Sequence, residues 1–352
     1  MIPLILDVDT GIDDAMALLY VCATPEVELL AVTCVAGNVD ARQVAENTRA
    51  VLELGGREGV EVALGRETPL VRSLETTPET HGPRGLGYAE LPPPSKDLSD
   101  RHAVDLLIEE ARARPGEITL VTLGPLTNLA IAVLKEPELP SLLKSYVLMG
   151  GAYRSPGNTA PTTEWNINVD PDAAKVVFRA WAVANEQRGT PRPLALGLDV
   201  TEKAKIVPDH VVALARRAGS RPDDSIALAA GEHPMLATRS VASNPVVRFV
   251  ADALRFYMEF HSRYDGFYGA FIHDPLAVAT ALDRSLVNTE ALAVDIELGG
   301  TLTTGETVTD WRRVWGKPPN VDVAVEADAE EFLSRFVDRV GGLAADRANV
   351  AR

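Results

Sequence analysis

The sequence of 352 residues contains little cysteine, few aromatic residues and fewer basic than acidic side chains. Its two cysteines, Cys22 and Cys34, are too few for a disulfide framework in a chain this long, so we expect both to be reduced and buried. Lysine and arginine number 34 against 50 aspartates and glutamates, which gives a net charge of −16. Because an acidic surface repels phosphate backbones, nucleic-acid binding is disfavoured, whereas uncharged small molecules are not excluded.

Long apolar runs are also missing. No uninterrupted stretch approaches the roughly 20 residues that a membrane helix needs. No basic segment followed by an apolar one opens the sequence, because the run at 2–6 meets Asp7 at once. We therefore expect a soluble, cytoplasmic protein without a membrane partner. At 46% hydrophobic residues the chain can bury a sizeable core, which excludes disordered and fibrous classes.

Apolar runs of strand length alternate with stretches of helical periodicity along most of the chain. The sequence predicts strands at 3–8, 27–36, 118–123, 145–149 and 321–325. It predicts helices at 13–22, 40–54, 103–114, 126–134, 171–182 and 329–340, with a mostly helical region from about 205 to 285. Strands that are apolar throughout favour a parallel sheet covered on both faces. We expect one α/β domain over 1–352, with a doubly wound, mostly parallel central sheet, a Rossmann-like core and ligands at the carboxyl ends of the strands.

Two long polar or proline-rich stretches, at 74–100 and 153–165, lie between regular elements. Loops of this length in a compact domain are usually lids or binding loops. We expect both to border a ligand site.

Four carboxylates lie within eight residues where the first strand meets the first helix: Asp7, Asp9, Asp13 and Asp14. Helix capping explains Asp13 and Asp14, because carboxylates at a helix N-terminus gain from its dipole. It does not explain the other two at the tip of a buried strand. A hard cation, Ca²⁺ or Mg²⁺, explains all four better, although the loop lacks the glycine and glutamate of an EF-hand.

One interpretation of this cluster is a phosphatase. The segment 7–10 resembles the nucleophile strand of haloacid dehalogenase-type phosphatases, in which Asp7 would be the nucleophile of a Mg²⁺-dependent reaction. That family does not expect Gly11 or the pair of acids after it. The phosphatase therefore stays an alternative.

Six sequence blocks in a fixed order resemble a second family, the inosine–uridine preferring nucleoside hydrolases. They are DVDTGIDDAMAL (7–18), VAGN (35–38), HGPRGLG (81–87), LGPLTN (123–128), MGG with GN and EWNINVDP (149–171), and HDP (273–275). The resemblance runs from about residue 3 to 340. It implies a nucleoside hydrolase-like fold, and hydrolysis of the N-glycosidic bond of a ribonucleoside to ribose and free base.

The resemblance also implies roles for individual residues. Ca²⁺ would be held by Asp9, Asp14, Asp274 and the backbone carbonyl of Leu123, with Asp9 activating a bound water. Asp7 would support the metal loop. Ribose would be bound by five side chains, namely Asp13, Asn158, Glu164, Asn166 and Asp274.

The departing base would be assisted by His273, His81 and Asn38 at the family's positions. Histidine suits this task because its unperturbed pKa lies near neutrality. The other four histidines are expected to be surface or satisfied core residues: His102, His210, His233 and His261. Four aromatic residues before His273 could stack on a base, namely Tyr264, Phe267, Tyr268 and Phe271.

Purine and pyrimidine substrates both remain open at this point. A non-catalytic binder of nucleosides or ribose is a third interpretation, but it would be expected to have lost a metal ligand, and none is missing. The resemblance further implies a homodimer or homotetramer.

Overall fold

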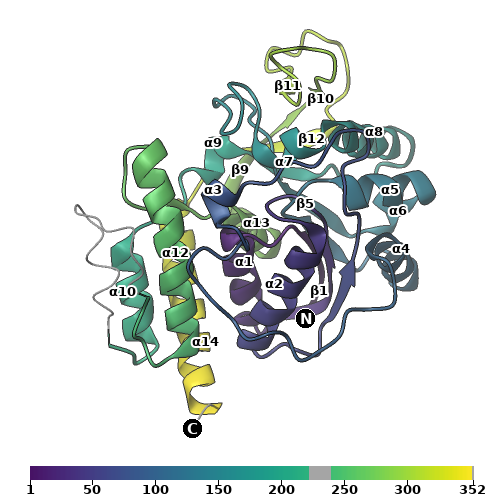
Figure 1. Cartoon of the computed structure of the whole chain (residues 1–352). Coiled ribbons are helices and arrows are strands. Elements are labelled where there is room, and N and C mark those ends of the chain that lie inside the picture. The colour runs from purple at the N-terminus through teal and green to yellow at the C-terminus, as the bar shows by residue number, and fades with distance from the viewer. Residues whose placement is uncertain (222–238, 351–352) are drawn as a thin grey trace.

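The computed structural model describes residues 1–221 and 239–350, and its centre is an eight-stranded sheet (Figure 1). The strands of this sheet are β1 (Ile2–Val8), β2 (Val27–Cys34), β3 (Glu61–Leu64), β4 (Thr119–Thr122), β5 (Ser145–Met149), β6 (Leu194–Leu196), β9 (Val287–Leu292) and β12 (Val321–Ala327). They lie in the order β3-β2-β1-β4-β5-β6-β12-β9, and only β9 runs antiparallel to its neighbour. The expected mostly parallel α/β sheet is confirmed.

Helices and two small two-stranded sheets surround this sheet. The helices are α1 (Ile12–Cys22), α2 (Ala41–Leu54), α3 (Pro78–His81), α4 (Ala103–Ala113), α5 (Thr127–Lys135), α6 (Leu139–Leu142), α7 (Trp165–Val169), α8 (Pro171–Arg188), α9 (Leu198–Thr201), α10 (Pro208–Arg217), α12 (Pro245–Tyr264), α13 (His273–Leu282) and α14 (Ala329–Val350). The small sheets pair β7 (Lys205–Ile206) with β8 (Ala270–Phe271) and β10 (Val294–Ile296) with β11 (Thr307–Thr309). All expected helices are present, and α8 and α14 extend further than their periodicity predicts.

Alternate side chains of the strands feed two cores, one on each face of the sheet. Leu4 and Leu6 of β1 pack with α1, α2, α12, α13 and α14, whereas Ile5 packs with α4, α5 and α8. Burial on both faces is why these strands are apolar throughout. Cys22 and Cys34 are buried and unpaired, as expected.

The strand order reverses beside β1, whose neighbours are β2 on one side and β4 on the other. Crevices at such a switch point are the usual ligand sites of open α/β sheets. α12 lies against α10 and α14 at one side of the molecule (Figure 1), and it also contacts α1. Across the described residues no helix is both long and apolar enough to cross a bilayer.

Candidate functional site

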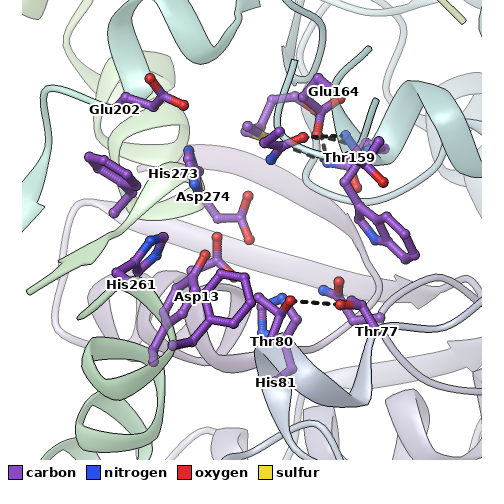
Figure 2. Close-up of a pocket in the computed structure, with 18 of the residues that line it drawn as sticks. Asp13, Thr77, Thr80, His81, Thr159, Glu164, Glu202, His261, His273 and Asp274 are labelled. Carbon is purple, nitrogen blue, oxygen red and sulfur yellow. Dashed lines mark hydrogen bonds between the residues drawn. The ribbon is translucent and has the colours of Figure 1, made fainter. Parts of the chain in front are cut away.

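A cavity of about 560 Å³ lies where β1 and β4 end. Both long loops border it, as expected: Thr77 and His81 come from the first, and Asn158 and Trp165 from the region of the second (Figure 2). The loops and the sheet edge therefore build one site from segments far apart in sequence.

Three buried carboxylates meet at the floor of this cavity. Asp13, Asp14 and Asp274 each place an oxygen within 4.8 Å of the other two. The Asp14 carboxylate accepts hydrogen bonds from the backbone N–H groups of Asp9 (3.2 Å) and Gly11 (2.9 Å). Asp14 therefore caps α1 and is also a member of the cluster. Asp274 arrives on the first turn of α13. Burial raises the pKa of Asp13 and Asp274 well above the usual carboxyl range, and the neighbouring charge of Asp14 raises both further.

Asp9 lies beside this cluster and is held from one side only. Its Oδ2 accepts the backbone N–H of Asn38 at 2.8 Å, while Oδ1 is buried and has no hydrogen-bond partner in the described part of the chain. Gly37 and Gly124 pack directly on the carboxylate: a Cβ on them would lie 2.1 Å from Oδ2 and 2.7 Å from Oδ1 respectively. Burial raises the pKa of Asp9 strongly, and the neighbouring Asp14 adds to the shift.

The oxygen atoms of Asp9 and the neighbouring acidic cluster fit the ligand set of a hard divalent cation. Carboxylate and carbonyl oxygens are the ligands such ions prefer, and buried like charges cannot all ionise without a counter-charge. The carbonyl of Leu123 accepts a bond from Asn166 Nδ2 (2.6 Å) and keeps a second lone pair. The cluster could therefore bind a metal ion, with Asp13 close to the expected ligands Asp9, Asp14 and Asp274.

Asp7 lies apart from the cavity. Its Oδ1 accepts bonds from Thr33 Oγ1 (2.5 Å) and Asn128 Nδ2 (2.8 Å), and the residue is fully buried. Burial raises its pKa to about 7. Asp7 connects the carboxyl end of β1 to β2 and α5. It is not among the residues that line the cavity, so it is not placed to attack a substrate there as a nucleophile.

The opposite wall is polar and is organised around Glu164, the N-cap of α7. Its carboxylate accepts backbone N–H bonds from Gly151 (2.9 Å), Asn166 (2.8 Å) and Ile167 (3.2 Å). Asn158 Oδ1 accepts the N–H of Trp165 at 3.0 Å, which connects the loop before α7 to the start of that helix. All five side chains that the resemblance assigns to ribose line the cavity: Asp13, Asn158, Glu164, Asn166 and Asp274.

His81, His273 and Asn38 also line the cavity. His81 Nδ1 accepts the backbone N–H of Ile12 (3.1 Å), so its Nε2 carries the proton of the neutral ring. His273 Nδ1 contacts Thr201 Oγ1 (2.8 Å), whose hydroxyl donates to a backbone carbonyl, so here Nδ1 carries the proton. Burial lowers the pKa of both histidines to about 3. Asn38 Nδ2 donates to Asp14 Oδ2 at 3.3 Å.

Several cavity residues escaped the sequence analysis. Tyr257, His261 and Asp265 follow at four-residue spacing along α12 and its C-cap and all line the cavity. The expectation that His261 is a satisfied core residue was wrong, because its Nε2 is buried without a partner among the described residues. That spacing places the three on one stripe of a helix, which was the available signal. His233 lies outside the described residues.

Of the four aromatic residues that were expected to stack on a base, two line the cavity and two do not. Tyr264 and Phe271 line the cavity, whereas Phe267 and Tyr268 are not among its lining residues. Phe267 packs on Phe271 with ring centroids 5.0 Å apart and so supports the wall from behind.

Comparisons with known proteins point to one family. A sequence model described as inosine-uridine preferring nucleoside hydrolase matches residues 4–334. The chain is 38% identical to a protein of that name from Leishmania major, over 95% of this chain and 96% of the relative. It is 36% identical to the pyrimidine-specific ribonucleoside hydrolase RihA of Salmonella arizonae, over 96% of this chain and 98% of the relative.

A solved structure agrees with the sequence relatives. The purine-preferring ribonucleoside hydrolase from Gardnerella vaginalis superimposes with a TM-score of 0.84 at 32% identity, covering 98% of this chain and 99% of that one. These findings give no support to the phosphatase alternative.

Proposed function

Because the chain belongs to the inosine-uridine preferring nucleoside hydrolase family, it is a hydrolase of N-glycosyl compounds, and we propose that it cleaves ribonucleosides with a Ca²⁺ ion and Asp9 at its centre. The observation that carries this proposal is the convergence of the acidic floor with the polar Glu164 wall in one cavity. At about 560 Å³ the cavity has the size range of small-molecule sites.

The proposed metal ligands are the carboxylates of Asp9, Asp14 and Asp274 and the carbonyl of Leu123. Ca²⁺ is bound through carboxylate and carbonyl oxygens, which are the ligands that this set provides. When bound, the ion lowers the pKa of a water molecule in the site and neutralises the buried charge.

Asp9 is the proposed general base. Its Oδ1 has no hydrogen-bond partner among the described residues and has lone pairs for both the ion and a proton, while Asn38 and the two glycines keep the carboxylate from turning away. Asn38 contacts both Asp9 and Asp14 and acts here as a positioning residue. This role adds to its expected place near the leaving nucleobase.

The sugar is held by the polar wall. Asp13, Glu164 and Asp274 accept hydrogen bonds from ribose hydroxyls, and Asn158 and Asn166 complete the pocket. Carboxylates on both sides of the ring also favour the positive charge that develops on ribose as the N-glycosidic bond breaks.

The leaving base meets His81 and His273. The neutral His81 ring donates from Nε2 to a base nitrogen, whereas neutral His273 offers a lone pair at Nε2 and donates only after taking up a proton. We assign both to the base side of the site.

The proposal also includes a single domain over 1–352, a homodimer or homotetramer as the family resemblance implies, and a cytoplasmic location. Light scattering of the purified protein checks the assembly.

Ribose release from inosine, adenosine, uridine and cytidine, as purified and after chelation, tests the function. We expect release that is lost on chelation and restored by Ca²⁺. Release of phosphate from phosphorylated compounds with Mg²⁺, and no ribose, would contradict it.

A further inference from the structure

A continuous wall of aromatic rings connects the two proposed leaving-group histidines. Ring centroids lie 5.3 Å apart for His81 and Tyr257, 4.7 Å for Tyr257 and His261, 4.8 Å for His261 and Phe271, and 5.8 Å for Phe271 and His273. All five side chains line the cavity. Figure 2 shows His261 and Glu164 on opposite sides of it. A flat aromatic base fits against such a wall.

Neither helix capping nor ring packing explains why a histidine occupies position 261 in this wall. It is 5% exposed, and its Nδ1 lies 2.7 Å from Asp265 Oδ2. A carboxylate accepts, so Nδ1 carries the proton and Nε2 presents a lone pair. That Nε2 has no hydrogen-bond partner among the described residues.

The surroundings keep the ring in this form. Burial lowers the pKa of His261 and outweighs the opposing effect of Asp265, so the ring is neutral near pH 7. Other ionisable groups around this end of the cavity include the lining residues His81, His273, Tyr257, Tyr264 and Glu202. Lys205 Nζ lies 5.4 Å from the centroid of the Phe271 ring. A buried acceptor without a partner is unfavourable until a donor reaches it.

We propose that His261 Nε2 accepts a hydrogen bond from an N–H group of the substrate's nucleobase, with Asp265 as the positioning residue that fixes the tautomer. This inference rests on the proposed function and deepens it. It makes His261 a specificity determinant, because a base without an N–H at that place leaves Nε2 unpaired.

The test compares nucleosides with their N-methylated partners: inosine with 1-methylinosine, uridine with 3-methyluridine, and adenosine with N6,N6-dimethyladenosine. For the preferred parent we expect kcat/KM at least tenfold above that of its methylated partner in the wild type. In His261→Phe the ratio falls to about 1–3, mainly because KM for the parent rises. Phenylalanine keeps the ring contacts but removes the acceptor, and it creates no room for a methyl group.

Three further variants separate recognition from packing. His261→Gln returns an acceptor oxygen and recovers part of the ratio, and Asp265→Asn lowers it by loosening the tautomer. His210→Phe, the same change on α10 outside the cavity, leaves it unchanged.

A ratio that stays the same in His261→Phe, or no discrimination in any wild-type pair, overturns the inference while leaving nucleoside hydrolysis intact. Failure to cleave any parent overturns the proposed function instead, and the inference with it.

Discussion

At the scale of single residues, two glycines decide where the Asp9 carboxylate lies. Gly124 follows β4 and Gly37 follows β2, and each takes the space beside Asp9 that a side chain would fill. Glycine is required at both positions because a side chain would not fit, and not because of backbone conformation, since neither residue has a positive φ. The loops after the two strands that flank β1 thus shape the position of the proposed base.

Gly124→Ala tests this steric role. Its Cβ would lie 2.7 Å from Asp9 Oδ1, so the carboxylate must move, and we expect kcat to fall at least 100-fold, as misplacement of a catalytic group by about 1 Å does. Gly59→Ala is the matched control, because its Cβ meets nothing within 4 Å. Equal activity of the two variants in steady-state assays would show that Asp9 tolerates displacement.

The residues of the site differ in how far the sequence could predict them. Asp9, Asp13 and Asp14 follow from a charge cluster at a strand end, and Glu164 and Asn166 from an ordered motif. His261 belongs to no motif, and its role depends on which stripe of α12 the tertiary packing turns toward the cavity. Sequence spacing shows the stripe but not where it faces.

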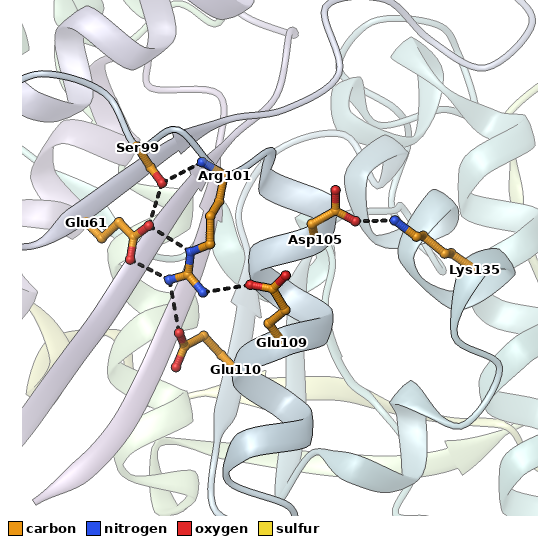
Figure 3. A network of polar contacts seen from close by, with 7 residues as sticks. All are labelled: Glu61, Ser99, Arg101, Asp105, Glu109, Glu110 and Lys135. Carbon is orange, nitrogen blue, oxygen red and sulfur yellow. Dashed lines mark hydrogen bonds and ion pairs between the residues drawn. The ribbon is translucent and has the colours of Figure 1, made fainter.

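At the scale of elements, the long segment between β3 and α4 carries α3 and His81, and Arg101 fastens its far end (Figure 3). Arg101 binds Glu61 of β3 (3.0 Å from Nε) together with Glu109 and Glu110 of α4 (3.0 Å each). One guanidinium therefore bridges three carboxylates and offsets part of their mutual repulsion.

Arg101→Met should lower the free energy of unfolding by about 1–2 kcal/mol, because a multi-partner charged network contributes more than an isolated surface pair. Lys135→Met is the control: its single ion pair with Asp105, drawn in the same figure, is exposed and should contribute less than about 1 kcal/mol. Urea unfolding measures both. A larger loss for the lysine variant would refute the ranking.

The elements themselves were largely predictable, and the exceptions have physical reasons. β3 and β6 have only four and three residues, too short for periodicity to register. β9 is an edge strand with exposed polar residues in its middle, so it lacks the apolar run of a central strand. The place of β12 between β6 and β9 follows from packing, which local sequence does not encode.

At the scale of the whole molecule, the site concentrates acidity in a chain that already carries −16. Among the described residues, burial raises the pKa of seven carboxyls: Asp7, Asp9, Asp13, Asp14, Glu164, Glu202 and Asp274. Each binds its proton more tightly in the folded than in the unfolded protein. Stability without metal must then fall as pH rises through the folded pKa values.

We therefore expect the Tm of the chelated protein to fall between pH 6.5 and 8.5. The buried histidines, whose pKa is lowered, act with the opposite sign but below about pH 6.5, so they leave this window clear. Saturating Ca²⁺ takes over the role of the protons on the buried carboxyl groups. The gain in Tm on adding Ca²⁺ should therefore be larger at pH 8.5 than at 6.5. Differential scanning calorimetry measures this, and a gain that shrinks with pH would refute it.

The central claim is that a water molecule activated at Asp9 hydrolyses the N-glycosidic bond, and that Asp7 is a structural residue rather than a nucleophile. The most direct measurement is ribose release from the preferred nucleoside by wild type, Asp9→Asn and Asp7→Asn under identical Ca²⁺. We expect Asp9→Asn to lose at least 1000-fold in kcat, within the range of a lost general base. Asp7→Asn should stay within about threefold of wild type, because an asparagine oxygen accepts the same bonds from Thr33 and Asn128. Turnover that survives in Asp9→Asn but disappears in Asp7→Asn would contradict the account.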